Sequence, residues 1–347
     1  MNKSIITRIV SALLCVCCAL TLAACGETKM SQSVVFAMDN VITVTAYGKQ
    51  REKGIQAAES VIKSMDAMLD PQLSTSITYK INTAGGENVS IPGQVANMLK
   101  TAQTVYKQSG GALDLSLYPV AKRWGFEDQR FYVPTDEELV EDLALKCFGD
   151  MVLTDFPSSG SHAVSLPSYG KISFAAIGKG SAAHNATDAM RKAGVTSGII
   201  SMGGNVQTLG SKPDGTDWVV AVQDPSNTES FVGVISCKET AIVTSGGFLR
   251  NFSQNGKTYH HILNPDSGVP MNNTLLSVTI ICPDGTLADA LSTAMFVLGE
   301  SKAIQYWRNY GGFEMVLINK DNEITCTKGL IEDFTLSNSS YTLRFTE

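Results

Sequence analysis

Residues 275–298, LLSVTIICPDGTLADALSTAMFVL, predict a strand that leads into a helix. Apolar and β-branched residues cluster over Leu275–Ile281, which is typical of a buried strand. Thr286–Leu298 is long enough for a helix, is mostly apolar and is followed by a glycine. In that helix Asp289 and Thr293 are four residues apart, so their side chains share one face. The segment therefore predicts a packed helix that carries one carboxylate among apolar residues.

On both sides of this segment, helix and strand patterns follow one another without regular alternation. Helical spacing of apolar residues covers Gly54–Leu69, Gln94–Gln108, Asp136–Lys146, Lys179–Ala193 and Lys302–Tyr310. Strand patterns cover Ser33–Gly48, Gly198–Ser201, Trp218–Gln223, Phe231–Ser236, Ala241–Thr244, Met315–Ile318, Glu323–Cys326 and Tyr341–Phe345. This order predicts an α+β fold with mixed, largely antiparallel sheets and packed helices. Because no G-x-G-x-x-G fingerprint follows a strand, a Rossmann domain is disfavoured.

The composition of the 347 residues excludes several classes of protein. The chain is 44% apolar and 17% charged, which is typical of a globular protein with a large core and excludes a mainly disordered chain. Its 27 Lys and Arg residues against 33 Asp and Glu residues leave a net charge of −6, so we expect no nucleic-acid partner. Long apolar runs are confined to one terminus, which excludes a polytopic membrane protein.

The first residues form a predicted secretion signal. Lys3 and Arg8 give a basic start, an apolar stretch follows to Leu22, and small residues precede Cys25. The Leu-Ala-Ala-Cys pattern resembles a bacterial lipobox, in which the cysteine thiol receives a lipid. We therefore expect a lipoprotein signal peptide over residues 1–24, a lipidated tether over residues 25–32, and anchoring to the extracytoplasmic face of the cell membrane. The alternative is an ordinary signal peptide with an incidental Cys25.

The other cysteines predict neither a zinc site nor a particular disulfide. Cys147, Cys237, Cys282 and Cys326 are widely spaced and contain no C-x-x-C pair. Cys237 and Cys282 lie in strand-like apolar runs and are expected to be inert core thiols. The sequence leaves the oxidation state of all four open.

Three short motifs could carry chemistry. Asp289 and Thr293 supply oxygen ligands suited to Mg²⁺, although this motif alone fits a dipole-stabilised helix-start aspartate better. His260 and His261 are adjacent, so in an extended segment at most one of them faces a given site as a general base. Gly-Lys-Gly around Lys179 precedes a helix, where backbone amides attract phosphate, but the same motif is common in turns.

The motifs become specific when they are taken together and in order. They are Ala-Met-Asp-Asn at 37–40, Ala-Leu-Asp-Leu-Ser at 112–116, Trp-Gly-Phe at 124–126, Ala-Ile-Gly-Lys-Gly at 176–180, Ser-Met-Gly-Gly-Asn at 201–205, Trp218–Pro225, Thr-Ser-Gly at 244–246, Tyr259–Pro265, Ser-Gly-Val-Pro at 267–270 and Ala288–Thr293. This series resembles the ApbE family of FAD:protein FMN transferases over roughly residues 34–299. The resemblance assigns residues 33–347 to a domain with the ApbE flavin-transferase fold.

What the resemblance implies is a phosphoryl-type transfer. The family uses Mg²⁺ as cofactor and FAD as substrate, cleaves the FAD pyrophosphate, attaches FMN to a threonine of an acceptor protein and releases AMP. The acceptors are flavoprotein subunits of membrane redox systems with a Ser/Thr-Gly-Ala-Thr type of motif. By motif, the metal ligands are Asp289, Thr293 and the backbone carbonyl of Ala176. The FAD-contact positions are Met38, Asp114, Leu115, Ser116, Ser173, Lys179 and Leu263.

By the same resemblance, His261 is the motif histidine, which we expect to help deprotonate the incoming threonine or to stabilise the transferring phosphate. Three features depart from the family pattern. Ser173 and Asn264 stand where the family usually has aspartates, and the segment 66–82 retains Asn82 but lacks much of the family's Arg/Ser pattern. Two alternatives are therefore kept. One is a hydrolase that splits FAD into FMN and AMP, and the other is a lipid-anchored protein that binds FAD without catalysis.

Overall fold

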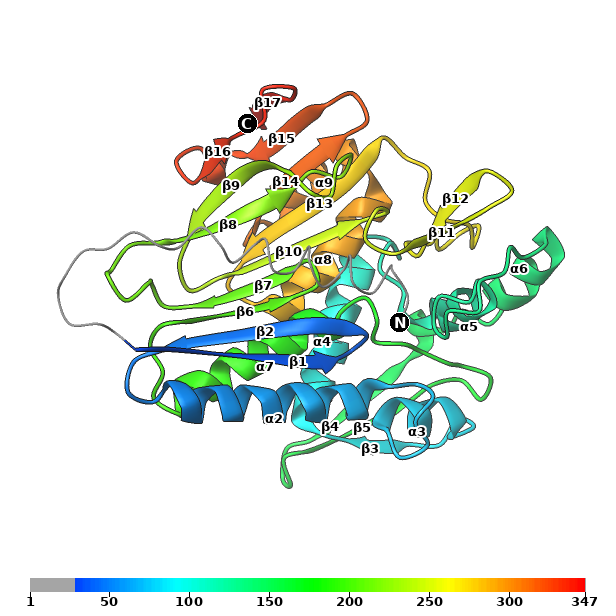
Figure 1. The fold of residues 1–347 in the computed structure, drawn as a ribbon. Coiled ribbons are helices and arrows are strands. Elements are labelled where there is room, and N and C mark those ends of the chain that lie inside the picture. The colour runs from blue at the N-terminus through cyan, green and yellow to red at the C-terminus, as the bar shows by residue number, and fades with distance from the viewer. Residues whose placement is uncertain (1–28, 347) are drawn as a thin grey trace.

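One long sheet organises the molecule. The computed structural model describes residues 29–346, and its nine-stranded sheet crosses the whole of Figure 1. In spatial order the strands are β1 (Met30–Ala37), β2 (Asn40–Tyr47), β6 (Gly198–Met202), β7 (Asn205–Leu209), β10 (Ala241–Gly246), β13 (Leu275–Cys282), β14 (Glu314–Asn319), β15 (Glu323–Thr327) and β17 (Thr342–Thr346). Every neighbouring pair is antiparallel except β15 and β17. The predicted α+β class with largely antiparallel sheets is confirmed.

Four helices cover one face of this sheet and close the main core. They are α2 (Arg51–Leu69), α4 (Gly93–Gln108), α7 (Gly178–Lys192) and α8 (Gly285–Leu298). Their apolar faces pack with the inward side chains of the strands in one continuous cluster. Helix α8, the apolar helix predicted from the sequence, packs against β10, β13 and α7. Its central position holds Asp289 in the protein interior.

A second, smaller sheet covers part of the other face. It contains β8 (Trp218–Gln223), β9 (Phe231–Cys237) and β16 (Phe334–Leu336). Its apolar side chains form a separate core with residues of β10, β14 and β15. In Figure 1 this sheet lies over the upper half of the long sheet, on the side away from α7 and α8. The lower strands β1 and β2 extend beyond it.

An arm projects from this body. We use the word for α5 (Tyr118–Arg123), α6 (Asp136–Leu143), the loop between them and the hairpin of β11 (Asn251–Gln254) and β12 (Lys257–His260). Figure 1 shows these elements at one end of the molecule. Aromatic side chains join the two parts of the arm, since the rings of Phe131 and Phe252 stack with centroids 4.7 Å apart. The arm therefore has a small core of its own.

The remaining elements are short or peripheral. They are α3 (Ile77–Thr83), a sheet of β3 (Val89–Ile91), β5 (Ser161–Ser165) and β4 (Val152–Phe156), helix α9 (Glu300–Tyr310), and the 3₁₀ turns η1 (Leu115–Leu117), η2 (Phe148–Asp150) and η3 (Lys328–Leu330). Among the helices of residues 29–346, none combines the length and the apolar character needed to cross a bilayer. The four cysteines of this part of the chain are free and buried.

The predicted helices all exist, but three of the predicted boundaries need correction. The strand pattern Ser33–Gly48 is two strands joined by a tight turn, and β1 begins at Met30, inside the predicted tether. The turn residues Met38 and Asp39 both have positive φ, at 51° and 57°, a conformation that sequence patterns register poorly without glycine. The predicted helix Asp136–Lys146 ends at Leu143. Residues 1–24 and Cys25 lie outside the described residues.

Candidate functional site

The centre of the site is the close crossing of α7 and α8. A Cβ on Gly180 would lie 2.0 Å from the carbonyl oxygen of Gly285 and 2.5 Å from Cβ of Asp289. Only glycine fits between the two helices at this point. The second glycine of the Gly-Lys-Gly motif, Gly180, thus lets one helix approach the other. This approach brings the N-terminus of α7 to the Asp289 side chain.

Asp289 is a buried carboxylate at the N-terminus of α7. Its Oδ2 accepts a hydrogen bond of 2.7 Å from the Gly180 backbone N–H, and the residue is 5% exposed. Burial raises the pKa of Asp289, while Lys179 and the Gly180 amide act in the opposite direction and favour the charged form. A carboxylate held in this way is costly to bury without a cation. The helix terminus and Lys179 supply part of that compensation.

Neutral oxygen donors accompany this carboxylate. The Thr293 hydroxyl, one helical turn from Asp289, lies 3.5 Å from the hydroxyl of Ser245 at the end of β10. The Ala176 carbonyl, just before α7, accepts no hydrogen bond from any residue between 29 and 346. Within that range no three His, Cys, Asp or Glu side chains are grouped to hold a metal. One carboxylate with neutral oxygens fits Mg²⁺, which binds few protein groups and prefers oxygen ligands.

Asn205 is a site residue that the sequence analysis did not single out. It lies on β7, is 1% exposed, and favours the charged form of Asp289. Its Nδ2 makes no hydrogen bond of normal geometry within the described residues. A buried amide donor without a partner next to a carboxylate suits a ligand oxygen. Asn205 ends the Ser-Met-Gly-Gly-Asn motif, and only the pairing of β6 with β7 shows where this asparagine lies.

The two adjacent histidines have different surroundings, as their spacing predicted. His260 Nε2 lies 3.0 Å from the Met271 carbonyl oxygen, and its ring packs edge-on against Phe296 in the body. His261 Nδ1 lies 3.0 Å from the Arg250 carbonyl oxygen. Because a carbonyl only accepts, His261 carries its proton on Nδ1 and leaves Nε2 as the acceptor. His260 is thus a structural residue, and His261 has a free nitrogen.

His261 is neutral at neutral pH. Its ring is partly exposed, but protein atoms surround it closely enough that desolvation lowers its pKa to about 3. The positive charge of nearby Lys179 acts in the same direction. Lys179 at the start of α7 thus acts electrostatically on Asp289 of α8 and on His261 at the end of β12.

Met38 borders the same region from the β1–β2 turn. Its backbone N–H donates to Oδ1 of Asp66 on α2 at 2.8 Å, and its carbonyl accepts from the Asn40 amide at 2.8 Å. These bonds hold Met38 in its positive-φ conformation. A Cβ on Gly178 would lie 3.4 Å from the Met38 side chain, so the turn contacts the start of α7.

Four of the other predicted nucleotide-contact positions belong to a separate buried network, namely Asp114, Leu115, Ser116 and Ser173. The Ser116 hydroxyl donates to Oδ1 of Asp114 at 2.6 Å and accepts from the amides of Cys147 and Phe148. Ser116 is fully buried, and burial raises the pKa of Asp114. The Ser173 backbone N–H donates to the Leu115 carbonyl at 3.0 Å, which joins the network to the segment before α7. The side chains of Leu115 and Ser116 therefore position the backbone around them.

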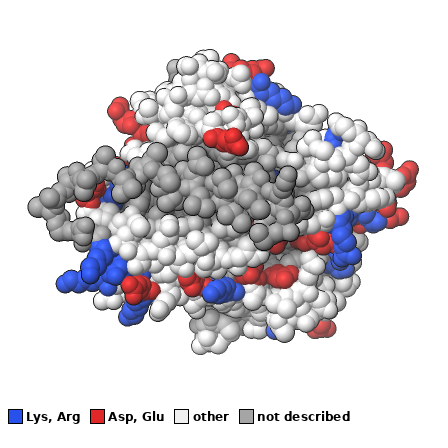
Figure 2. Space-filling model, in the orientation of Figure 1, with Lys and Arg blue, Asp and Glu red and all other residues white. Residues whose placement is uncertain are grey.

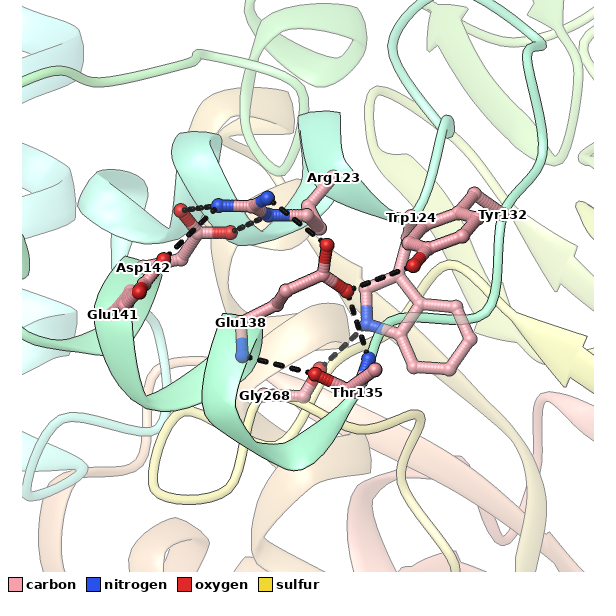
Figure 3. Close-up of polar contacts among 8 residues, drawn as sticks. All are labelled: Arg123, Trp124, Tyr132, Thr135, Glu138, Glu141, Asp142 and Gly268. Carbon is pink, nitrogen blue, oxygen red and sulfur yellow. Dashed lines mark hydrogen bonds and ion pairs between the residues drawn. The ribbon is translucent and has the colours of Figure 1, made fainter.

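Leu263 lies in the arm. It is 5% exposed and packs with Val120, Trp124, Phe126 and Leu139. The Trp124 indole N–H donates to the Gly268 carbonyl at 2.8 Å, which fastens the segment after His261 to α5 (Figure 3).

Ion pairs join α5 to α6 within the arm. Figure 3 shows the Arg123 guanidinium between the carboxylates of Asp142 and Glu138, with nitrogen–oxygen distances of 2.6 and 3.4 Å respectively. Glu138 also caps α6, since its side chain and that of Thr135 each accept a hydrogen bond from the other's backbone N–H. The arm thus fixes the backbone that carries His261.

Known proteins are similar to this chain in sequence and in fold. The model of the ApbE family matches residues 38–317. The FAD:protein FMN transferase of Haemophilus influenzae is 28% identical, with 91% of this chain and 94% of that protein covered. The transferase of the same name from Treponema pallidum is 27% identical, with 96% of each chain covered.

Solved structures agree with this result. The ApbE protein of Thermotoga maritima is 25% identical and superposes with a TM-score of 0.80 over 87% of this chain and 98% of its own. The flavinyl transferase ApbE of Pseudomonas stutzeri, in its apo form, is also 25% identical, with a TM-score of 0.77 over 91% of this chain and all of its own. The family match covers well over half of the sequence and includes both helices of the crossing. This chain belongs to the ApbE family.

Proposed function

We propose that the protein is an FAD:protein FMN transferase. Its curated relatives carry this name, and they are matched over nearly their whole length. The observation that carries the proposal is the meeting of the buried Asp289 carboxylate, Lys179 and the unprotonated nitrogen of His261. These groups provide negative charge for a cation, positive charge for a phosphate and a proton acceptor, which together suit phosphoryl transfer.

Mg²⁺ would be held by the Asp289 carboxylate, the Thr293 hydroxyl and the Ala176 carbonyl. When bound, it would neutralise charge on the FAD pyrophosphate and supply a Lewis acid for the transfer. Lys179 adds a second positive charge at the N-terminus of α7, where backbone amides also favour phosphate oxygens. Asn205 offers its unpaired amide N–H to an oxygen of the same ligand.

His261 is the proposed proton acceptor. Its Nε2 takes the proton of an acceptor threonine hydroxyl as that oxygen forms a bond to the FMN phosphorus. The bond between this phosphorus and the bridging oxygen of the pyrophosphate breaks, and AMP leaves with that oxygen. The hydrogen bond from Nδ1 to the Arg250 carbonyl keeps the ring in the required tautomer. A bound pyrophosphate would raise the basicity of the neighbouring imidazole, which suits this role.

The location and partners follow from the same proposal. Cys25 would carry a lipid that anchors the enzyme at the extracytoplasmic face of the cell membrane. The acceptor would be a flavoprotein subunit of a membrane redox system with a Ser/Thr-Gly-Ala-Thr type of motif. Anchoring both proteins at one membrane raises their effective concentration.

The test is an incubation of the enzyme with FAD, Mg²⁺ and a small acceptor domain that bears the threonine motif. Intact-mass analysis measures FMN on the acceptor, and chromatography measures AMP and free FMN. We expect one FMN per acceptor with release of AMP, and loss of both with a chelator. Free FMN without labelled acceptor would instead show a hydrolase, and unchanged FAD would show a binding protein.

A further inference from the structure

An apolar row lies exposed on the edge strand of the long sheet. Met30, Val34 and Phe36 share one face of β1 and are 54%, 64% and 74% exposed, with the polar Gln32 between Met30 and Val34 on that face. Val41, paired with Phe36 across the hairpin, is 45% exposed. The intervening residues Val35 and Ala37 are buried on the helical side of the strand. Edge strands of soluble proteins usually avoid exposed rows of this kind, because the rows invite association. The row therefore fits a surface that something else covers.

A basic patch adjoins the start of this row. Lys29, Lys49 and Lys53 are exposed and form no ion pair with another described residue, and Arg51 lies between the latter two. The Gly48 N–H donates to the Lys29 carbonyl at 3.0 Å, which brings residue 29 next to this turn. Figure 2 shows Lys and Arg side chains gathered at the end of the molecule where β1 and α2 begin. Such a cluster is notable in a chain whose net charge is −6.

The chain leading to β1 restricts what can lie against this surface. Cys25 precedes Met30 by five residues, which span at most about 17 Å when fully extended. A lipid on Cys25 would thus hold the row and the basic patch close to the bilayer surface. Apolar side chains next to lysines are the combination that binds the interface of a membrane with anionic lipids.

We propose that the β1 edge, formed by Met30, Val34, Phe36, Val41 and the basic patch, lies against the anionic membrane surface in the anchored enzyme. This inference rests on the proposed lipidation of Cys25. The apolar side chains enter the headgroup region, and the lysines bind lipid phosphates. Because the turn at Met38, which joins the end of β1 to the start of β2, lies beside α7, the contact also fixes the orientation of the active site relative to the membrane.

The experiment uses the full mature lipoprotein in vesicles of phosphatidylcholine and phosphatidylglycerol. Val34→Cys and Val140→Cys carry an environment-sensitive fluorophore at 64% and 67% exposed positions, and Val140 lies on α6 at the other end of the molecule. Labelling is specific, since the four cysteines of the described region are buried and Cys25 is lipidated. Lipids with a nitroxide near the headgroup serve as the quencher.

We expect blue-shifted emission and strong quenching of the Val34 label, with neither effect at Val140. Quenching should decrease in a Lys29→Glu, Lys49→Glu, Lys53→Glu variant and in vesicles without phosphatidylglycerol. Equal quenching at the two positions would overturn the proposal, as would a Val34 response that requires the acceptor protein. An intact mass without lipid on Cys25 would overturn it too.

Transfer of FMN to a soluble acceptor is measured on the same samples. Retained transfer with equal quenching would disprove the membrane contact alone. Lost transfer with selective quenching at Val34 would support the contact and disprove the proposed activity.

Discussion

The α7–α8 crossing and the arm contribute to one site in different ways. At the crossing, two helices pack so closely that Gly180 admits no side chain, and Asp289 is buried in the main core. In the arm, aromatic rings stack at a partly exposed surface, where Phe131 is 40% exposed, and Arg123 forms ion pairs near solvent. The crossing holds the Asp289 carboxylate in a fixed position. The arm carries His261 on a smaller core of its own.

The largest expected effect comes from removing the charge at the crossing. Asp289→Asn should lower kcat/KM for FMN transfer by about 100-fold or more, because the proposed Mg²⁺ site loses its only carboxylate. The folded protein should keep its stability, since the amide oxygen can still accept from the Gly180 N–H and the burial of a charge is avoided.

Asp284→Asn is the matched control for that variant. It makes the same change at the N-cap of α8, where Oδ1 accepts from the Thr286 and Leu287 amides and asparagine caps equally well. Transfer by Asp284→Asn should stay near the wild-type rate. A similar loss in both variants would show that Asp289 has no special role at the crossing.

The next effect tests the rigidity of the crossing. Gly180→Ala should destabilise the protein by about 3 kcal/mol, because the added methyl group meets the Gly285 carbonyl at 2.0 Å and neither helix can retreat. Gly178→Ala on the same helix meets only the flexible ends of Leu69 and Met38, at 3.3 and 3.4 Å, and should change stability by less than about 1 kcal/mol. Urea unfolding measures both. Equal losses would contradict the tight packing at Gly180.

The arm should be weakened locally by removal of one hydrogen bond. Trp124→Phe leaves the Gly268 carbonyl without its indole donor and should cost about 1–3 kcal/mol. Hydrogen exchange should accelerate in α5, α6 and the β11–β12 hairpin while the long sheet keeps its protection. Trp307→Phe removes the same type of bond, from Trp307 to the Phe313 carbonyl, in the body. Trp307→Phe should leave hydrogen exchange in the arm unchanged. Faster exchange in the arm of both variants would show that the arm does not open independently of the body.

The smallest effect is a dependence of stability on pH. Burial lowers the pKa of both His260 and His261, so below about pH 6.5 the unfolded chain binds protons that the folded protein does not. Stability should therefore fall as the pH drops from 6.5 towards 5. Each histidine contributes up to about 1.4 kcal/mol per pH unit. His261→Gln should reduce this slope, as measured by urea unfolding at several pH values, and an unchanged slope would mean that His261 is not buried as described.

The crossing was easier to predict from sequence than the arm. A long apolar helix with one carboxylate is visible in residues 286–298, and periodicity suffices for its existence and its end at Leu298, whereas the burial of Asp289 emerges only from the packing of α7 against α8. The β1–β2 turn escaped prediction because Met38 and Asp39 adopt positive φ without glycine. The β11–β12 hairpin escaped because its four-residue strands are mostly polar and exposed.

Contacts distant in sequence account for the remaining gaps. Asn205 contacts the site only because β7 pairs between β6 and β10, which no local pattern reveals. Leu115 and Ser116 match positions at which the family contacts the nucleotide. In the structure their side chains are buried in the body, and the Ser116 hydroxyl contacts the Cys147 amide. For His260 and His261 the two-residue period of a strand indicated that at most one of them faces the site. The hydrogen-bond partners that distinguish them, the Met271 carbonyl for His260 and the Arg250 carbonyl for His261, are distant in sequence.

The most direct test of the account compares binding with transfer in His261→Gln. Dissociation constants for FAD with Mg²⁺ and single-turnover rates of FMN transfer would be measured on the variant and the wild type. If the crossing holds the substrate and the arm supplies the proton acceptor, transfer should fall by about 100-fold or more, and the dissociation constant should change by less than about threefold. Equal losses of binding and transfer would contradict this division between the two regions.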